Sequence, residues 1–257
     1  MTLLHLYPHE LNMYGDRGNV LALAQRALWR GITLDIRPVG LGEDFDPELA
    51  DIIFIGGGQD AQQIAVSEDL LAFKQKSMSQ AAQQKVVMLA ICGGYQLLGH
   101  YYKPHQGSEL RGLSVLDVYT IAGTKRLIGN IALRREDGTT LVGFENHSGQ
   151  TFLGQQKGLT PLGTVLAGYG NNGQSGEEGA VFENIYGTYL HGALLPKNPA
   201  LSDELLLKAL IRRYGHPKAS ALMRPLSDAL EQAAHHAAIE LAHRQRRPQR
   251  RSFFSGF

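Results

Sequence analysis

The segment Lys85–Ile91 is almost entirely apolar, and it ends abruptly at Cys92, which two glycines follow. An apolar run of this length that ends at a turn signal is typical of a strand that is buried on both faces of a parallel sheet. The residues from Gly93 onward predict a tight turn that opens a helix, because glycines permit a sharp change of backbone direction. The sequence therefore predicts an α/β fold in which its only cysteine lies at a strand-to-helix elbow.

The setting of Cys92 favours a reactive thiolate. The free N–H groups of a first helical turn lie close to the side chain that precedes them, where they stabilise negative charge. The same N–H groups can later stabilise an oxyanion. A lone cysteine is more often a buried structural residue, but the flanking glycines and the preceding strand favour a nucleophile at this position.

Strand and helix patterns alternate along the first hundred residues. Strands are predicted at Leu3–Tyr7, Ile32–Val39, Asp51–Ile55 and Lys85–Ile91, and helices at Asp16–Arg30, at Glu68–Ala82 and from Gly94. This alternation predicts a mostly parallel sheet flanked by helices, whose functional loops lie beyond the carboxyl ends of the strands. Cys92 is at such an end.

The second half of the chain has a different pattern. Residues 110–190 are rich in strand patterns and glycine, with a hairpin turn predicted at Asp137–Gly138 and an irregular loop at residues 168–176. We interpret this part as a continuation of the same domain. Helices are predicted at Leu201–Tyr214 and Leu226–His243, and the second is expected to pack either on this domain or on a partner.

Composition limits the class of protein. The chain has 257 residues, of which 43% are hydrophobic, and a formal net charge of +1. It can bury the core of one α/β domain with additions, and its charge favours neither nucleic acid nor an acidic partner. One cysteine cannot form an internal disulfide, and the first ten residues lack the pattern of a signal peptide. No apolar stretch approaches the roughly 18 to 20 residues that cross a bilayer. We therefore expect a cytoplasmic protein.

Basic residues concentrate at residues 244–251, shortly before Phe253 and Phe254. One interpretation is a solvated, flexible terminus. The other is a weak anchor for anionic lipid head groups, which would place the protein at the inner face of the membrane. Both interpretations stay open from the sequence.

A cysteine nucleophile needs a base and a set of oxyanion donors. His191 is the best placed of the ten histidines, because it ends a short apolar strand and precedes a glycine. The run Gly56–Gly58 follows the predicted strand Asp51–Ile55, and its glycines would let backbone N–H groups approach a tetrahedral oxygen. Taken alone, this run is also typical of an ordinary tight turn.

Four segments in this order resemble the class I glutamine amidotransferases of the CobB/CobQ type. They are the loop Gly56–Gly58 and residues 92–99, 143–149 and 187–192. The resemblance spans residues 3–214 and implies a flavodoxin-like α/β fold. It further implies that Cys92 attacks the side-chain amide of glutamine while His191 transfers the proton. By the same resemblance, Gly57, Gly58 and Gly93 would hold the oxyanion and bind glutamine, and the products would be glutamate and ammonia.

The sequence departs from the usual pattern of this class behind the histidine. Many class I members carry a glutamate two residues after it, as the third group of a triad, whereas this chain has Ala193. CobB/CobQ-type members share this departure. From the sequence, the site is at best a dyad within this chain, and a carboxylate supplied by a partner stays open.

Within the CobB/CobQ type, residues 7–19, 125–130 and 144–147 look most like the GatD family. Members of that family pair with a MurT-like, Mur-ligase-type synthetase that amidates the D-glutamate of lipid II to D-isoglutamine in peptidoglycan synthesis. The resemblance implies a heterodimer in which the partner uses ATP and Mg²⁺, whereas this chain holds no cofactor and no metal. It also implies that Arg126 contacts substrate.

The resulting division of the chain has three parts. Residues 1–214 form the amidotransferase domain, 215–243 a C-terminal helical extension, and 244–257 a basic tail. Two alternatives stay open: the amidotransferase component of a cobyrinate or cobyric acid amidating system, and a non-catalytic subunit that lends only a binding surface.

Overall fold

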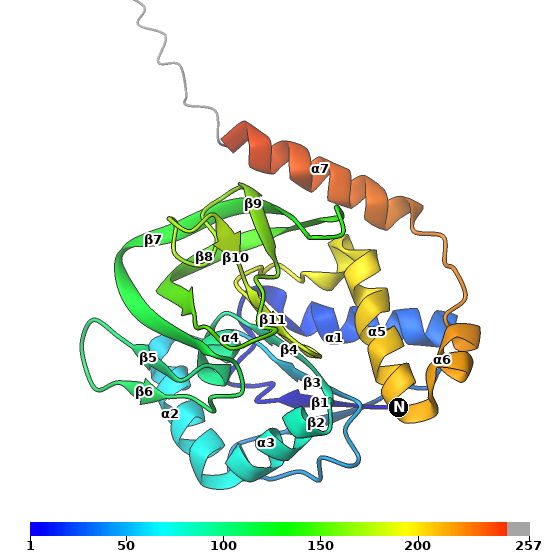
Figure 1. The fold of residues 1–257 in the computed structure, drawn as a ribbon, viewed down its shortest axis with the longest axis horizontal. Coiled ribbons are helices and arrows are strands. Elements are labelled where there is room, and N and C mark those ends of the chain that lie inside the picture. Colours follow the sequence, from blue (N-terminus) through cyan, green and yellow to red (C-terminus); the bar gives the residue numbers. More distant parts are fainter. Residues whose placement is uncertain (246–257) are drawn as a thin grey trace, which may run out of the picture.

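A computed structural model describes residues 1–245 of the chain. Its first sheet has six strands, in the order β11-β12-β4-β3-β1-β2 (Figure 1). The strands are β1 (Thr2–Leu6), β2 (Asp35–Val39), β3 (Ile52–Ile55), β4 (Val87–Ile91), β11 (Ala180–Phe182) and β12 (Ile185–Thr188). All neighbours pair in parallel except β11, which lies antiparallel to β12 at the edge. The predicted mostly parallel sheet is confirmed.

Helices cover both faces of this sheet. On one face, α1 (Arg17–Trp29) and α5 (Pro199–Tyr214) share a core with Leu3 and Ile52; on the other, α2 (Asp60–Asp69) and α3 (Gln75–Gln83) share one with Leu4 and Ile53. Successive side chains of a strand point to opposite faces, so a strand between two helical layers must be apolar at every position. Strand β4 lies between two helical layers, which explains why the residues before Cys92 are apolar without interruption.

The strand-rich half of the chain forms a second sheet, which the sequence interpretation did not foresee. Its strands are β5 (Tyr101–Lys103), β6 (Leu110–Arg111), β7 (Val118–Arg134), β8 (Thr140–Leu153), β9 (Gly163–Ala167) and β10 (Glu177–Glu178). The long β7–β8 hairpin turns at the predicted dipeptide, where Gly138 has a φ of 84° and the Thr139 N–H donates to Asp137 (Figure 1).

Several boundaries differ from the prediction. The helix expected at Glu68–Ala82 begins eight residues earlier, at Asp60, because the first turns bury few apolar side chains and so show a weak helical pattern. A π-helical segment, Leu70–Lys74, joins α2 to α3 and buries Lys74 against Asp69. A short helix that was not predicted, α6 (His216–Leu222), follows α5.

The last helix, α7 (Ala229–Gln245), packs on this chain. It lies across the β7–β8 hairpin, where Ala242 is buried against Ala132 and Val142 (Figure 1). One imidazole, that of His235, joins three elements, since its ring nitrogens contact the Thr140 hydroxyl and the Lys197 carbonyl, both at 2.8 Å. Of the two expected positions for this helix, the structure shows contact with the domain. Most of the predicted basic tail, residues 246–257, lies outside the described residues.

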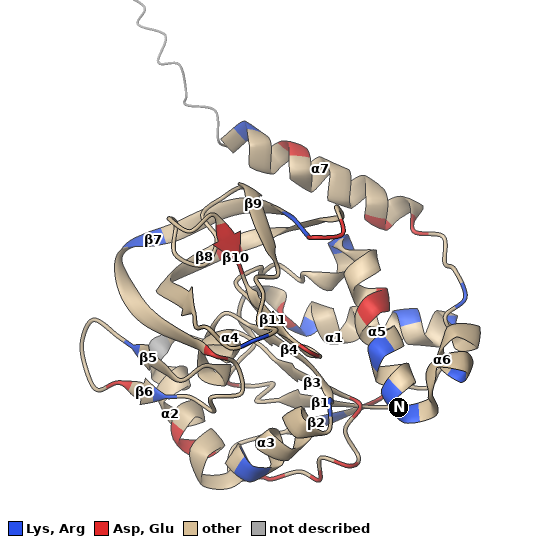
Figure 2. Cartoon of the chain, viewed as in Figure 1, with Lys and Arg blue, Asp and Glu red and all other residues tan. Residues whose placement is uncertain are grey.

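Charged residues are scattered along the helices, strands and loops of the ribbon (Figure 2). Several tie α5 to the sheet, as when Arg213 pairs with the buried carboxylate of Asp51 at 3.0 Å. Within residues 1–245, none of the helices combines the length and apolar character that crossing a bilayer requires.

Candidate active site

Four neighbouring strands of the first sheet end at one edge. The order β12-β4-β3-β1 and its parallel register align Thr188 with Ile91, and Ile55 with both Ala90 and Leu6. The segments that follow these strand ends carry His191, Cys92, Gly57 and Asp16. The topology therefore brings together residues that lie up to 175 positions apart in the sequence.

Cys92 occupies the predicted elbow between β4 and α4 (Gly93–Leu98). Its backbone has a φ of 50° and a ψ of −105°, a conformation that is strained for a residue with a side chain. A Cβ atom at Gly94 would lie 2.7 Å from Ile55 and 2.9 Å from the Gly56 carbonyl oxygen. Only glycine allows α4 to start so close to β3, and this closeness holds the sulfur at the strand end.

The glycine loop after β3 meets the segment that follows β1. A Cβ at Gly56 would lie 2.1 Å from the Leu11 carbonyl oxygen, so a larger residue would push the two segments apart. A Cβ at Gly57 would lie 2.8 Å from His191 Cε1, 3.2 Å from Cys92 Cβ and 3.3 Å from Asp16 Oδ2. The side chains of His191, Cys92 and Asp16 therefore converge on Gly57, where the absence of a side chain leaves room for them.

His191 is buried, with 1% of its surface exposed, and its backbone exchanges two hydrogen bonds with Phe144 on β8. Burial alone would lower the pKa of its imidazole. The negative charge of the Cys92 thiolate and a hydrogen bond to Asp16 outweigh burial and raise this pKa to about 10. The surroundings therefore favour the imidazolium form of His191.

Asp16 is a residue that sequence patterns did not single out. Its side chain is completely buried, and Oδ1 lies 3.4 Å from His191 Nδ1. Its other oxygen, Oδ2, accepts the Gly57 N–H at 2.8 Å. No local pattern signals this carboxylate, because it comes from the loop before α1 whereas His191 follows β12.

The second contact of Asp16 changes the role predicted for Gly57. Because its N–H is already donated to Asp16, Gly57 is not a free oxyanion donor in this structure. In the described part of the chain, the N–H groups of Gly58 and Gly93 make no hydrogen bond. These two remain suited to an oxyanion.

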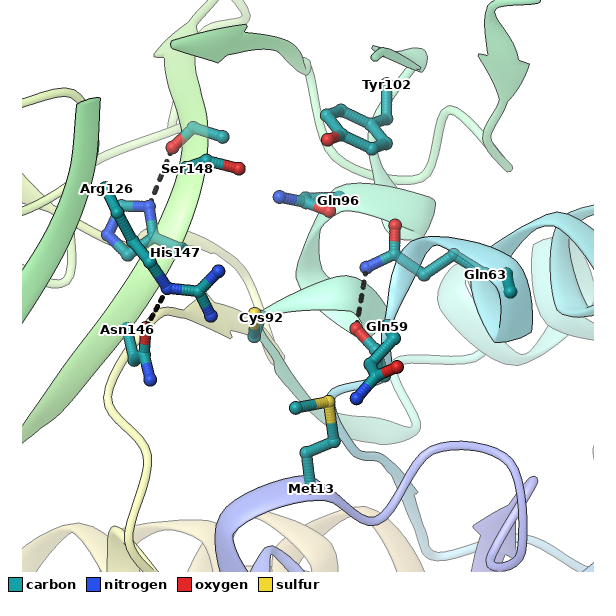
Figure 3. A pocket seen from close by; sticks show the side chains of 13 residues that line it. Met13, Gln59, Gln63, Cys92, Gln96, Tyr102, Arg126, Asn146, His147 and Ser148 are labelled. Carbon is teal, nitrogen blue, oxygen red and sulfur yellow. Dashed lines mark hydrogen bonds between the residues drawn. The ribbon is translucent and has the colours of Figure 1, made fainter. Parts of the chain in front are cut away.

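A pocket of about 300 Å³ opens beside the sulfur of Cys92. Figure 3 shows it between two walls, one with Gln63 on α2 and Gln96 on α4, the other with Arg126 on β7 and His147 on β8. The lining residues are Met13, Gly58, Gln59, Ala61, Gln63, Cys92, Gln96, Tyr102, Arg126, Asn146, His147, Ser148 and Gly149.

Two buried acceptor atoms of the lining have no protein partner within the described residues: Oε1 of Gln63 and Oε1 of Gln96. The Gln96 side-chain amide is held by donating to the Tyr189 hydroxyl at 3.0 Å. His147 Nδ1 lies 2.7 Å from the Gly149 carbonyl oxygen, which only accepts, so Nδ1 carries the proton. Burial lowers the pKa of His147 to about 4, so its imidazole is neutral at neutral pH. The pocket thus offers acceptors to a ligand with N–H groups.

Of two further residues considered in the sequence, Arg126 lies at the pocket and Tyr95 lies in the core. Arg126 lines the pocket, is exposed, and donates from Nε to Asn146 Oδ1. Tyr95, next to Gln96 in the sequence, is instead buried in the core and donates to Asn171 at 3.3 Å. Among the residues that the structure describes, no three His, Cys, Asp or Glu side chains form a group that could hold a metal ion.

Comparison with known proteins gives this geometry a family. Residues 2–199 match the model of the CobB/CobQ-like glutamine amidotransferase domain. A glutamine amidotransferase from Thermotoga maritima shares the fold, with a TM-score of 0.52 over 94% of each chain at 14% identity. At that identity the likeness speaks for the fold alone.

Curated relatives lie closer in sequence. The chain is 42% identical over 217 residues to the GatD subunit of the glutamine-hydrolysing lipid II isoglutaminyl synthase of Streptococcus pneumoniae, covering 84% of this chain and 82% of that one. It is 41% identical to the same subunit of Staphylococcus aureus, covering 83% and 86%. A probable cobyric acid synthase of Methanothermobacter thermautotrophicus matches 42% of this chain and 24% of its own length at 35% identity. The chain therefore belongs to the CobB/CobQ-like glutamine amidotransferases, in the family of the GatD subunits.

Proposed function

We propose that this chain is the glutaminase subunit of a lipid II isoglutaminyl synthase, hydrolysing L-glutamine to glutamate and ammonia. The observation that supports it most is the convergence of Cys92, His191 and Asp16 on Gly57 beside a pocket with unpartnered amide acceptors. The GatD relatives, each described as a subunit of such a synthase, support the same function.

The pocket suits the functional groups of glutamine. The free acceptors on the side chains of Gln63 and Gln96 fit the N–H groups of an α-ammonium or a carboxamide. Arg126, on the opposite wall from the two glutamines, suits the α-carboxylate through a charge-assisted bond. The volume of about 300 Å³ is at the lower end of the range for small-molecule sites, as expected for a single amino acid.

The geometry leads to an order of chemical steps. The Cys92 thiolate attacks the carbonyl carbon of the side-chain amide, and the N–H groups of Gly58 and Gly93 stabilise the oxyanion. The bond that forms at sulfur removes the charge that raised the pKa of His191, so the imidazolium becomes a stronger acid. It then protonates the departing amine, and the C–N bond breaks. Water activated by the neutral imidazole hydrolyses the thioester to glutamate.

The ammonia is delivered to a second subunit. The resemblance to GatD assigns that role to a MurT-like, Mur-ligase-type synthetase, which would bind ATP and Mg²⁺ and amidate the D-glutamate of lipid II. Lipid II is a membrane lipid, so the heterodimer would work at the inner face of the membrane while this chain stays in the cytoplasm.

The test is transfer of isotope from glutamine to lipid II. The chain, a MurT-like partner, ATP, Mg²⁺ and lipid II are incubated with amide-¹⁵N-glutamine, and the product is analysed by mass spectrometry. We expect ¹⁵N in the lipid with the parent chain, and none with Cys92→Ala. The matched control supplies ammonium chloride, with which the Cys92→Ala complex is expected to amidate lipid II as the parent does.

Two outcomes would contradict the proposal. Equal glutamine-dependent amidation with Cys92→Ala would mean that the chain is a binding subunit without its own chemistry. Glutamate release that depends on Cys92, but leaves lipid II unamidated under both nitrogen sources, would mean that the acceptor is another carboxylate.

A further inference from the structure

The turn after His191 lacks the glutamate that many class I members carry two residues after the histidine. Two residues after His191, Ala193 has a φ of 49°, and a Cβ at Gly18 would lie 2.7 Å from the Cβ of Ala193. The first turn of α1 thus packs directly on the turn after His191. Two residues before Gly18, Asp16 places its carboxylate beside the imidazole of His191.

Hydrogen bonds fix the position of the Asp16 side chain and of the loop that carries it. Its loop is tied to the glycine loop in both directions, because the Met13 N–H donates to the Gly57 carbonyl oxygen at 3.1 Å while the Gly57 N–H donates to Asp16 Oδ2 at 2.8 Å. The Asn12 side chain accepts the Arg17 N–H at 3.0 Å and closes the turn into α1. These contacts leave Oδ1 facing His191 Nδ1.

Electrostatics favour a charge pair over a purely structural contact. Both side chains are buried, with exposures of 1% for His191 and 0% for Asp16. A buried carboxylate without a compensating positive charge is costly, and an imidazolium at His191 supplies that charge. The separation of 3.4 Å is long for a hydrogen bond, but such contacts tighten when the imidazole is protonated in the reacting complex.

Resting on the proposed function, we infer that Asp16 is the positioning residue of His191 and takes the place of the missing glutamate. It fixes the Nδ1–H tautomer, which turns Nε2 toward Cys92, and it stabilises the imidazolium after proton transfer. Because its second oxygen holds Gly57, Asp16 also fixes the loop that presents the Gly58 N–H. The carboxylate therefore comes from this chain, and none from the partner is needed.

The test compares Asp16→Asn with Asp51→Asn. An asparagine at position 16 can still accept the Gly57 N–H through its amide oxygen, yet it cannot balance an imidazolium. Asp51 is a matched control, since it is also completely buried and also accepts a backbone N–H, from Thr2, but lies at the opposite end of β3.

Two readouts separate this inference from the proposed function. The first is the rate at which iodoacetamide alkylates Cys92, measured against pH without glutamine; the reaction reports one site because the chain has one cysteine. We expect Asp16→Asn to move the midpoint of this profile upward by at least about one pH unit. The second is steady-state glutamine hydrolysis, for which we expect kcat to fall by about 10² to 10⁴ with little change in KM. Asp51→Asn is expected to change neither.

Each outcome decides the matter. An alkylation profile and a kcat that match the parent would overturn the inference. A lower kcat with an unchanged alkylation profile would also overturn it, because Asp16 would then act only through Gly57. If the parent hydrolyses no glutamine, the proposed function fails, while a shifted alkylation profile would still support Asp16 as the partner of His191.

A measurement on the parent protein covers the case in which Asp16→Asn does not fold. In the proton NMR spectrum, an Nδ1–H held by a carboxylate gives a resonance far downfield, and His191→Gln identifies it by its loss. We expect this resonance in the parent. A spectrum in which the assigned Nδ1–H of His191 lies in the ordinary imidazole range would count against the charge pair.

Discussion

At the scale of single residues, the site depends on what Gly57 lacks. His191, Cys92 and Asp16 each approach the place where a side chain at position 57 would begin. A local motif of three glycines suggests only a tight turn or an oxyanion loop. The contact distances show that the glycine also makes room for the side chains of His191, Cys92 and Asp16 together.

Gly57→Ala should therefore lower glutamine hydrolysis by at least about 100-fold, because a shift of about 1 Å in a catalytic group can have an effect of this size. The added methyl would lie 2.8 Å from His191 Cε1, so the imidazole must move. The matched control is Gly40→Ala, whose added methyl would meet nothing closer than 3.8 Å. Steady-state kinetics of both variants check this, and a Gly57→Ala enzyme with parental kcat would disprove the packing argument.

At the scale of elements, helix α7 packs on the β7–β8 hairpin and stabilises it. Its buried face places Ala242 against Ala132, Val142 and Ala167, while most of its other side chains are exposed. The hairpin in turn carries Arg126, Asn146 and His147 to the pocket and bonds the backbone of His191 through Phe144. The helix thus supports the site from a distance, through the strands.

Ala242→Asp should destabilise the chain, and Ala237→Asp should not. The first substitution buries a charge without a partner, which we expect to lower the free energy of unfolding by about 2 to 4 kcal/mol. The second lies on the exposed face of the same helix, where changes usually stay within about 0.5 kcal/mol. Urea denaturation of both variants measures the difference. Equal midpoints would mean that α7 does not pack on the hairpin in solution.

At the scale of the whole molecule, the second sheet is joined to the first by a buried carboxyl group. Glu178 on β10 accepts the Thr188 hydroxyl at 2.9 Å and the Tyr189 N–H at 2.6 Å, both at the end of β12 just before His191. Burial raises the pKa of Glu178 to about 8, although these hydrogen bonds oppose the shift. The charge state of this group therefore affects how the two sheets are held together.

The sign of the effect on stability follows from this pKa. The folded state binds the proton more tightly than the unfolded state, in which the pKa is near 4.5. The stability contributed by protonated Glu178 is complete below pH of about 4.5 and is lost as the pH rises through about 8. Relative to Glu178→Gln, the free energy of unfolding of the parent should fall by up to about 5 kcal/mol over this window, because each unit of the pKa difference corresponds to about 1.4 kcal/mol. Thermal denaturation of both proteins at several pH values checks it, and parallel pH profiles would contradict the assignment.

How far the sequence could predict the molecule depends on the range of the interactions. The strand before Cys92, the elbow and the turn at Asp137–Gly138 are local, and their patterns were sufficient. The second sheet was missed because strand patterns do not say which strands pair. Asp16 was missed for a related reason: its contact with His191 spans 175 positions and depends on the order of β12, β4, β3 and β1.

The most direct test of the central claim is covalent labelling by an electrophilic analogue of glutamine, such as a diazoketone, followed by intact-mass and peptide mass spectrometry. The claim is that glutamine binds beside Cys92 and is attacked by it. We predict one adduct per chain, located at Cys92. Its formation should be slowed by L-glutamine but not by the control amino acid L-leucine, and it should be absent in Cys92→Ser. Labelling elsewhere, or labelling of Cys92 at a rate that L-glutamine does not change, would contradict it.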